Sequence, residues 1–480
     1  MRYGVLARSV LAMALSGITL LAYGADFWYP RHGFFADPWN TRSHVPAFGT
    51  YSEGRFGLPR LPLRHPPEPA RLQQLRSLPA ITDWALQHNP KTAAAWDALE
   101  AQASALGVAK GLWLPTISAQ VQGQRGQTVY SQGFSAPPLN GLYNTLSLSE
   151  ELFNFGYRRT SIAKAEAATL VTRLETDITI QQVALNVANT YYGLAEARAD
   201  VRIYRSGVRQ ARQIEQDTRS QYRAHLKPIT DNYQAQNILA EEEESLAAAE
   251  GSERSARGAL AEAAGLPVAS RLQVFSPQTS GDQLLRPIQH WLRVGLLHNP
   301  SILADLASAR EARRTIGQAE AQGLPSVSLV GDIGQNLFRH VPNEHSFSIG
   351  LQINIPFDSN FSTNYHVQED RALYREARAN TRAEAQSILL NLWQAYAGLR
   401  SAHRAETAVE AQVKSAQKAV SGIRTQYRIG LANILELTIA EENLISARIT
   451  RAQVLAQYYQ DRAALFSYAG MAPQKKLQGN

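Results

Sequence analysis

The chain has 480 residues, 48 basic against 41 acidic side chains, a formal net charge of +7 and no cysteine. The absence of cysteine excludes a disulfide framework, a thiol nucleophile and a lipidated cysteine. The basic residues are mostly arginines spread beside nearly as many acids in helix-compatible segments. A solvated helical surface explains this pattern better than nucleic-acid binding, because no basic run is interleaved with aromatic residues.

Residues 1–24 are typical of a secretory signal peptide. Arg2 and Arg8 supply positive charge, an apolar run covers 10–21, and small residues stand at the cleavage positions. The apolar run is too short to cross a bilayer as a helix. An ordinary hydrophobic N-terminal helix is the less favoured alternative, so we expect an exported protein.

Most of the remaining chain consists of an internal sequence repeat that occurs twice. The segment Trp84–Pro90 returns at 294–300, 210 positions later, and Gln221–Arg223 returns at 426–428, 205 positions later. Such a long period indicates one supersecondary unit duplicated in tandem. The predicted organisation is an irregular Pro- and aromatic-rich extension over 25–79, a first repeat over 80–265, a linker over 266–283, a second repeat over 284–470 and a tail over 471–480.

Each repeat is expected to begin with an interrupted helix. The first helix starts near Ile81 with Thr82 or Asp83 as its cap, is interrupted at Asn89-Pro90, and continues to about Leu112. Its counterpart in the second repeat covers about Leu284 to Gln322.

Beyond Pro115 and Pro325 the apolar period changes from about 3.6 to 2, which predicts strands. The expected strands cover 116–126, 142–153, 326–335 and 345–357. In a soluble sandwich their apolar face would pack in a core, and in an outer-membrane barrel it would contact lipid. Strand length and the export signal favour the barrel, whereas Glu150 on the apolar face counts against it unless it lies at the membrane edge.

Very long helices follow the strands. Proline-free segments over 157–223 and 362–428 each have 67 residues, or about 100 Å of helix. Shorter helices are expected over 229–264 and 434–469, and each can stack end to end with the interrupted helix of its repeat. Small alanine side chains indicate closely packed antiparallel coiled coils. A soluble periplasmic coiled-coil scaffold is the alternative, but it leaves the amphipathic strands unexplained.

Several motifs, and the order in which they follow one another, resemble the TolC-like outer-membrane factor family. They are Asn-Pro near the start of each repeat, Leu-Pro before each first strand, Leu152-Phe153-Asn154-Phe155-Gly156, Ile355-Pro356-Phe357-Asp358, Tyr191-Tyr192 and 426–431. The resemblance covers about 80–470. It implies an α+β membrane protein of long antiparallel helical coiled coils plus β-hairpins, a homotrimer with a barrel of about 12 strands, and a periplasmic α-helical tunnel.

The resemblance also implies a function. The chain would be a passive exit duct in the Gram-negative outer membrane, not an enzyme, in contact with outer-membrane lipid. Its partners would be a periplasmic adaptor protein and an inner-membrane ABC or proton-driven transporter. Both type I protein secretion and small-molecule or drug efflux fit, and the missing lipidated cysteine favours secretion.

The turns between the long and short helices are the expected docking sites for the adaptor. In the family these tips meet the adaptor, and here they comprise Arg223, Ala224, His225, Leu226, Arg428, Ile429, Gly430 and Leu431. Gly430 suits a positive φ in the second turn. His225 stands where a glycine is usual, which calls the geometry of the first turn into question. A purely structural role for these turn residues is equally open.

Residues just after the tips match family positions at the periplasmic aperture. These are Thr230, Asp231 and Glu436, and three copies of the two acids would form an acidic ring. Ala432 replaces a usual arginine partner and Ile439 a second acid, so we expect a more loosely held closed state. Alternatively, the acids only favour the first turns of their helices.

Other chemistry is sparse. The sequence has no phosphate-binding loop or catalytic motif, and we expect no cofactor and no metal site. His88 and His298 occupy equivalent repeat positions, for which structure is the better explanation. The run Glu241–Glu244 is expected to be a solvated helix face.

Overall fold

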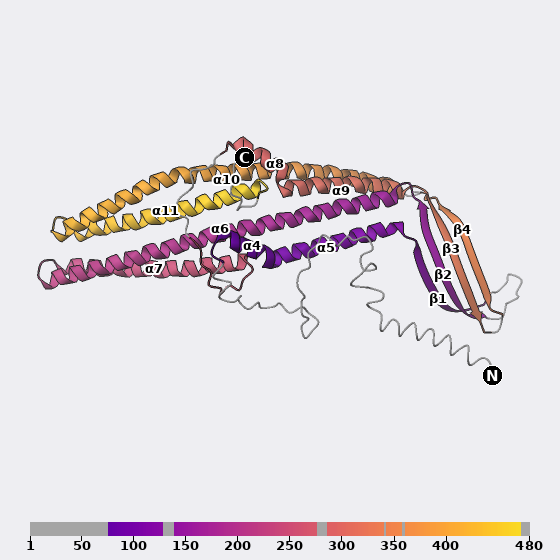
Figure 1. The fold of residues 1–480 in the computed structure, drawn as a ribbon, viewed down its shortest axis with the longest axis horizontal. Coiled ribbons are helices and arrows are strands. Elements are labelled where there is room, and N and C mark those ends of the chain that lie inside the picture. The colour runs from indigo at the N-terminus through magenta and orange to yellow at the C-terminus, as the bar shows by residue number, and fades with distance from the viewer. Residues whose placement is uncertain (1–74, 128–138, 276–285, 340–341, 358–360, 472–480) are drawn as a thin grey trace. The chain divides into compact units, whose positions relative to one another are not determined.

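The computed structural model describes residues 75–127, 139–275, 286–339, 342–357 and 361–471 (Figure 1). The predictions for the signal peptide, most of the extension over 25–79, part of the linker and nearly all of the tail lie outside these residues. The described elements are α4 Leu78–His88, α5 Pro90–Lys110, the 3-10 helix η1 Gly111–Trp113, β1 Thr116–Gly126, β2 Leu139–Phe153, α6 Tyr157–Arg223, α7 Ile229–Ala263, α8 Ile288–His298, α9 Pro300–Gln322, β3 Ser326–Phe338, β4 Glu344–Asn354, α10 Ser362–Arg428 and α11 Ile434–Tyr468.

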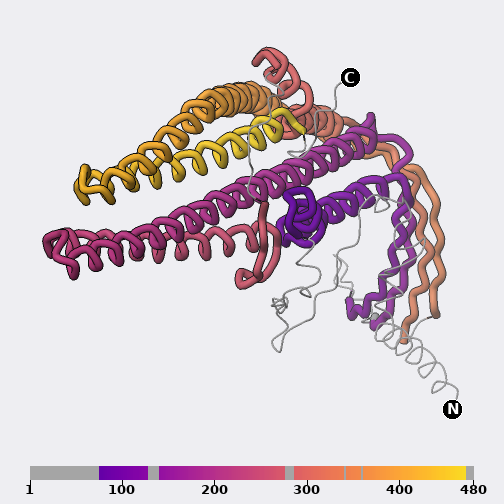
Figure 2. Tube along the Cα trace, turned by 60° about the vertical axis from the view of Figure 1, so that its left-hand side comes forward, coloured from indigo at the N-terminus to yellow at the C-terminus, as the bar shows by residue number. Residues whose placement is uncertain are grey.

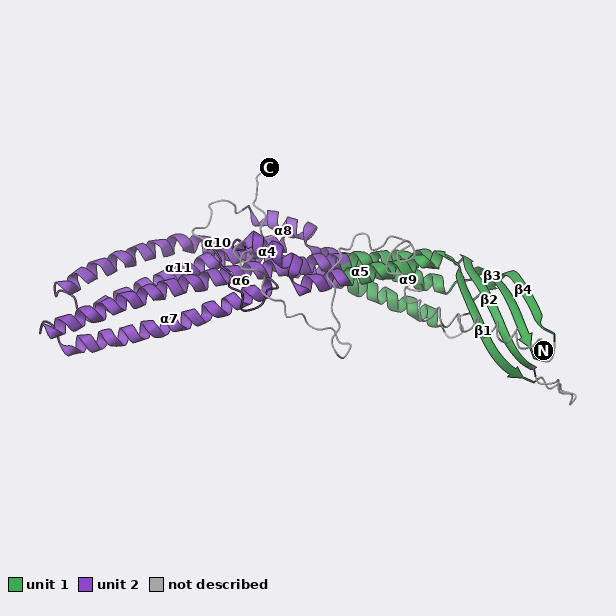
Figure 3. Ribbon diagram, turned by 60° about the horizontal axis from the view of Figure 1, so that its bottom comes forward, with its two compact units in different colours: residues 1–47, 98–172, 307–378 green, residues 48–97, 173–306, 379–480 purple. Residues whose placement is uncertain are grey.

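The described chain forms two compact units, and each unit draws on both predicted repeats (Figure 3). The first contains residues 98–172 and 307–378, which include the four strands. The second contains the described residues of 75–97, 173–306 and 379–471, and it includes the hairpins α6–α7 and α10–α11. The long helices α6 and α10 each begin in the first unit and end in the second.

The first unit holds one antiparallel sheet in the order β1-β2-β3-β4. Strand β2 begins three residues earlier than predicted and β3 ends three residues later, because Gly141 of β2 pairs with Phe338 of β3. A Cβ at position 141 would lie 2.9 Å from the Phe338 ring, so glycine leaves room for the aromatic side chain. Because glycine has no side chain, it also interrupts the alternation of apolar and polar residues from which the strand was predicted. Strand β4 ends at Asn354 rather than 357, and Pro356 has no amide N–H to continue the ladder.

One face of the sheet is apolar and exposed. The register aligns Ile117, Leu148, Gly331 and Ile349 across all four strands, and it aligns Ser118, Ser147, Asp332 and Ser348 on the opposite face. On the polar face, the Ser147 hydroxyl donates to Asp332 at 2.6 Å. The exposed apolar side chains are Ile117, Val121, Leu146, Ile333, Phe347, Ile349, Leu351 and Ile353.

Glu150 lies at the end of β2, where the sheet meets the helices. Its carboxylate lies 3.5 Å from the buried guanidinium of Arg158, in the first turn of α6. The same guanidinium lies 4.5 Å from the centre of the Trp113 ring. The charge on Glu150 is therefore compensated by Arg158 at the helical end of the strand.

The second unit consists of paired helices (Figure 2). Its buried apolar side chains form clusters between these helices. One apolar cluster joins Ile81 and Ala85 of α4 to Leu194 of α6 and Leu260 of α7. A second joins Trp291 of α8 to Leu392 of α10, Leu465 and Phe466 of α11. Among the helices that the structure describes, none is both long and apolar enough to cross a membrane.

Ion pairs join α6 to α7 at intervals of seven residues along α6. Arg198 pairs with Glu253 at 3.2 Å, Arg205 with Glu250 at 2.8 Å, and Arg212 with Glu243 at 2.7 Å. Arg205–Glu250 and Arg212–Glu243 are exposed, so each is worth less than about 1 kcal/mol, whereas Arg198–Glu253 is partly buried. Their spacing is that of a coiled coil, as the alanine-rich sequence predicts.

The cap of the first helix corrects the sequence prediction. Helix α4 begins at Leu78, and its N-cap is Ser77, whose Oγ accepts from the Ala80 amide. Pro79 falls inside the first turn, where its missing N–H would have no helical partner in any case. Thr82 lies within the helix, with its hydroxyl donating to the Leu78 carbonyl at 2.9 Å.

Candidate functional site

The two hairpins of the second unit end in turns of the same geometry. In the first turn the Leu226 amide donates to the Gln221 carbonyl at 2.9 Å, and His225 has φ +57°. In the second, the Leu431 amide donates to the Gln426 carbonyl at 2.8 Å, and Gly430 has φ +80°. Both are Schellman motifs, in which a left-handed residue ends the helix. His225 therefore adopts the conformation that glycine supplies in the other copy.

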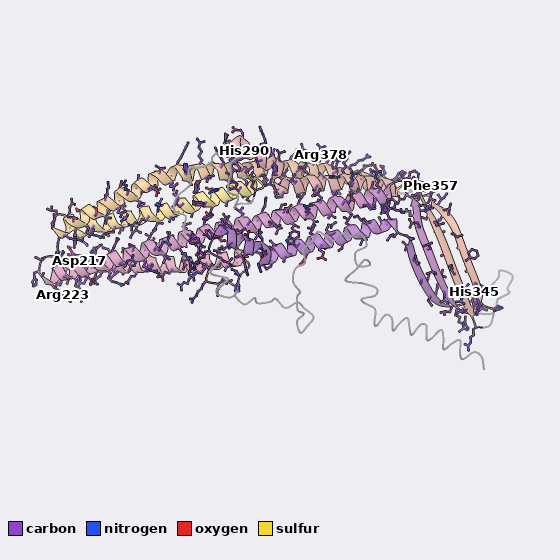
Figure 4. The ribbon with its side chains drawn as sticks, in the orientation of Figure 1. Asp217, Arg223, His290, His345, Phe357 and Arg378 are labelled. Carbon is purple, nitrogen blue, oxygen red and sulfur yellow. The ribbon has the colours of Figure 1, made fainter. Side chains whose placement is uncertain are left out.

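Apolar side chains protrude from both turns. Leu226, Ile429 and Leu431 are all strongly exposed, and Arg223 and Arg428 close the long helices beside them. Figure 4 labels Arg223 at the end of α6, with Asp217 two turns earlier on the same helix. Ala224 follows Arg223 in the turn. The predicted tip residues thus form two exposed surfaces with an apolar and a basic part.

The aperture residues lie directly after these turns. Asp231 is in the first turn of α7 beside Thr230, and Glu436 is in the first turn of α11. Asn433 caps α11: its Oδ1 accepts from the Glu436 amide at 2.8 Å, and its Nδ2 donates to the Glu436 carboxylate at 3.1 Å. Asn433 thus caps the helix, and the Glu436 carboxylate holds the capping side chain in place, so Glu436 supports its helix start.

Neither aperture acid is paired with a base. Among the ion pairs of the described residues, none includes Asp231 or Glu436. Ala432, which replaces the usual arginine, is buried with Tyr427 and Leu437 in an apolar cluster. Near the tips, the contact between the α6–α7 and α10–α11 hairpins therefore depends on apolar packing.

Sequence reasoning missed Tyr427, which lies at the centre of this contact. Its side chain packs against Ile214 of α6 and Ala235 of α7, and Lys227 lies 5.2 Å from its ring centre. Burial, with the nearby carboxylates of Asp231 and Asp217, raises the pKa of Tyr427 to about 12. The phenol stays protonated. The available signal was that tyrosine occurs in both copies of the Gln-Tyr-Arg motif. The helix turn itself does not require a large aromatic ring, so its repetition indicates a packing role.

Further from the tips, α6 and α7 carry two half-buried acids, Asp200 and Glu242. Burial and the neighbouring Glu196 raise the pKa of Asp200 to about 6. Burial, then Glu442, Glu441 and Glu241, raise the pKa of Glu242, whose carboxylate lies over Gly207 of α6. Glu242 thus departs from the solvated face predicted for 241–244, because α7 turns this residue toward α6 and α11.

The remaining candidates are structural. The His88 ring stacks on Trp84 with centroids 3.8 Å apart, and its Nδ1 lies 2.9 Å from the Trp84 carbonyl. Nδ1 of His298 lies 3.2 Å from the Val294 carbonyl. Within the described ranges, no group of three or more histidines and acids is arranged to hold a metal ion.

Comparison with known proteins identifies the family. The model of the outer membrane efflux protein family matches residues 82–266 and 291–471. The chain belongs to this family. It is therefore an outer-membrane exit duct with a helical periplasmic part, and the soluble scaffold is not favoured. Each matched segment corresponds to one predicted repeat and ends one residue beyond it.

Relatives of this outer membrane efflux protein agree along most of its length. Protein CyaE of Bordetella pertussis is 26% identical over 423 residues, covering 86% of this chain and 88% of that protein. The outer membrane protein VceC of Vibrio cholerae has a TM-score of 0.73 at 20% identity, over 83% of this chain and 97% of its own.

Two further channel structures have the same fold. The CmeC outer membrane channel of Campylobacter jejuni has a TM-score of 0.75 at 16% identity, over 90% of this chain and 96% of its own. The open state of the Neisseria gonorrhoeae MtrE channel has a TM-score of 0.71 at 18% identity, over 91% and 99%. The likeness extends to a channel in its open state.

Proposed function

We propose that this chain is a tandemly duplicated subunit of a passive homotrimeric channel, through which a tripartite system exports its cargo. The sheet carries the proposal. Strands β1 and β4 are edges of a four-stranded sheet, and every residue of β4 is exposed. Unpaired strand edges cannot stand in a bilayer, and four strands are too few to close a barrel. Three copies supply about 12 strands and leave no edge.

The two sheet faces supply the two surfaces such a barrel needs. The face with Ile349 contacts lipid, and the face with Asp332 and its serine neighbours lines a wet lumen. The long helices continue the channel into the periplasm. The duct performs no covalent chemistry, and it takes its energy from an inner-membrane transporter to which a periplasmic adaptor connects it.

The tips Arg223–Leu226 and Arg428–Leu431 are the proposed contact with the adaptor. Their exposed leucines and isoleucine offer apolar area, and their arginines favour an acidic rim on the partner. Thr230, Asp231 and Glu436 form the proposed aperture, where three copies of two unpaired acids give a moderate cation preference. Without an arginine in place of Ala432, apolar packing around Tyr427 holds the aperture closed.

The transported class is proposed to be a protein, as in type I secretion, rather than a small molecule. The support is the lack of any cysteine that could carry a lipid anchor. Deletion of the gene separates the two classes: loss of a secreted protein from the medium supports secretion, and increased drug sensitivity with normal secretion supports efflux.

Neighbouring residues of β4 provide a matched test of the barrel. Ile349→Arg places a charge on the apolar face, where an arginine at mid-membrane costs about 2–4 kcal/mol. We expect this variant to be lost from the outer-membrane fraction. Ser348→Arg places the same charge on the polar face beside Asp332, and it should still give a heat-modifiable trimer. Equal recovery of both variants would contradict the barrel.

A further inference from the structure

Gly207 of α6 leaves room for the carboxyl group of Glu242 on α7. A Cβ at position 207 would lie 3.1 Å from the carboxyl carbon of Glu242 and 3.0 Å from Cδ1 of Ile445 on α11. Glu441 lies about one turn before Ile445 on the same helix. The carboxyl group of Glu242 is therefore placed against α6 and beside the part of α11 that carries Glu441.

The charges that act on Glu242 are all negative. They come from Glu442 and Glu441 of α11 and from Glu241 of α7 itself. The titratable neighbour on α6 is Tyr204, a phenol on which Glu242 acts in turn. No basic side chain is among these groups, so Glu242 faces an excess of negative charge.

Two buried carboxylate oxygens in this group have no hydrogen-bond partner. One is Oε2 of Glu242, and the other is Oε2 of Glu441, a residue that is only 7% exposed. The second oxygen of Glu441 accepts from Arg424 of α10, and the arginines of α6 at 205 and 212 pair with other glutamates of α7. Buried polar atoms are almost always bonded and facing carboxylates repel each other, so the group lacks a donor.

A proton on Glu242 removes both difficulties. A protonated carboxyl group has an O–H that can donate, and it carries no charge toward α11. Burial, and then the neighbouring carboxylates, raise the pKa of Glu242 above its ordinary value of 4.5. A metal ion is a less suitable occupant, because within the described ranges no three acids or histidines are arranged to hold one.

We propose that Glu242 holds a proton while α7 and α11 lie close together, and that release of this proton loosens the contact between the two helices. On release, the O–H bond of the carboxyl group breaks, the proton passes to water and a carboxylate remains, facing Glu442 and Glu441. Glu441 lies only about 8 Å along α11 from the aperture acid Glu436. The proton site needs only the described helices, whereas its effect on the aperture rests on the proposed channel.

The C=O band of protonated carboxyl groups in the infrared spectrum tests the proton directly, because ionised groups do not absorb there. The purified full-length protein is titrated with pH beside Glu242→Gln, and the difference between the two spectra reports position 242. Glu244 is exposed on the same helix, and Glu244→Gln reports it in the same way. We expect a midpoint at 242 at least about one pH unit above that at 244. Equal midpoints would overturn the proposal.

Two further variants distinguish the facing carboxylates from burial alone. Glu441→Gln and Glu442→Gln each remove a charge that acts on Glu242, so each should lower the midpoint at 242. Each is compared with the double variant that also carries Glu242→Gln. An unchanged midpoint in both would mean that burial alone holds the proton, and it would overturn the link between the proton and α11.

Open probability in planar bilayers between about pH 5 and pH 8 tests the effect on the aperture. It should rise with pH in the natural protein, because a midpoint raised by one unit shifts the equilibrium between close and separated helices by up to about tenfold. Glu242→Gln stays uncharged and should lose this rise. If no channel forms, the proposed function and its regulation both fail, and the infrared result still decides the proton site. A channel whose pH profile is the same in Glu242→Gln would overturn the regulation alone.

Discussion

The side-chain amide of Asn89 donates a 2.9 Å hydrogen bond to the carbonyl of Ala263, at the last residue of α7. Asn299 makes the equivalent 2.9 Å bond to Tyr468, the last residue of α11. Both asparagines also accept from the amide two residues later, at Lys91 and Ser301. One side chain thus starts a helix and ties it to the end of another.

Asn89→Ala should destabilise the protein by about 1–3 kcal/mol, because it leaves the Ala263 carbonyl without its partner in a buried place. Thermal unfolding in detergent measures the effect. Asn189→Ala removes an exposed amide from α6 and should change stability by less than about 0.5 kcal/mol. An equally small effect at Asn89 would mean that water replaces the bond.

Gly470→Ala should cost more stability than Gly430→Ala. Both glycines have positive φ, so both substitutions carry a strain of about 1–2 kcal/mol. A Cβ at 430 meets nothing within 4 Å, whereas a Cβ at 470 would lie 2.6 Å from the carbonyl carbon of His298. We expect an additional loss of at least about 1 kcal/mol at 470. Denaturant unfolding of the two variants provides the comparison, and equal losses would argue against the contact.

His225→Gly should stabilise the first hairpin turn by up to about 1 kcal/mol, because glycine adopts positive φ without strain. Hydrogen exchange at the ends of α6 and α7 reports local opening, which should become slower. Faster exchange would mean that the imidazole makes a stabilising contact. The same substitution should leave exchange at the second turn unchanged.

Asp200→Asn should raise stability at pH 8 and change it little at pH 4. The folded-state pKa of Asp200 is raised to about 6 from 3.8 in the unfolded chain. The folded state therefore binds the proton more tightly, and its contribution to stability is lost as pH rises through about 6. Melting temperatures across this range measure the difference. The exposed Glu244→Gln on α7 serves as control, and parallel profiles for all three proteins would contradict the assignment.

Replacing Asp231 and Glu436 with Ala should raise single-channel conductance in planar bilayers by about twofold or more and reduce any cation preference. The helix starts would lose favourable acids, so stability is measured in parallel. Glu244→Ala removes an acid on an exposed part of α7 and should leave conductance unchanged. Unchanged conductance and selectivity in the double variant would remove both residues from the aperture.

The long helices follow from local signals in the sequence. Both 67-residue helices have the predicted bounds, because a turn residue or glycine stands near each end and no proline lies in the interior. The β-strands follow from alternation where the alternation is clean, as in β4. Where Gly141 interrupts the pattern, the strand ends depend on pairing with β3, which a local pattern does not contain.

In the candidate site, too, some residues can be located from local sequence signals and others only from tertiary packing. The turns at His225 and Gly430 can be located from the sequence, since the helix ends define them. The cap Ser77 falls within the segment 25–79 that was predicted to be irregular, although the proline that follows it is tolerated in a first turn. The position of Tyr427 against Ile214 depends on packing between helices more than 200 residues apart, which single-sequence patterns do not specify.

The three arginines 198, 205 and 212 also constrain how α6 and α7 wind. A straight α-helix turns once in 3.6 residues, so a seven-residue row drifts around its surface by about 20° per interval. A left-handed twist of the two helices around each other keeps such a row facing α7. The three ion pairs of this hairpin therefore favour a supercoiled pair of helices over a straight one.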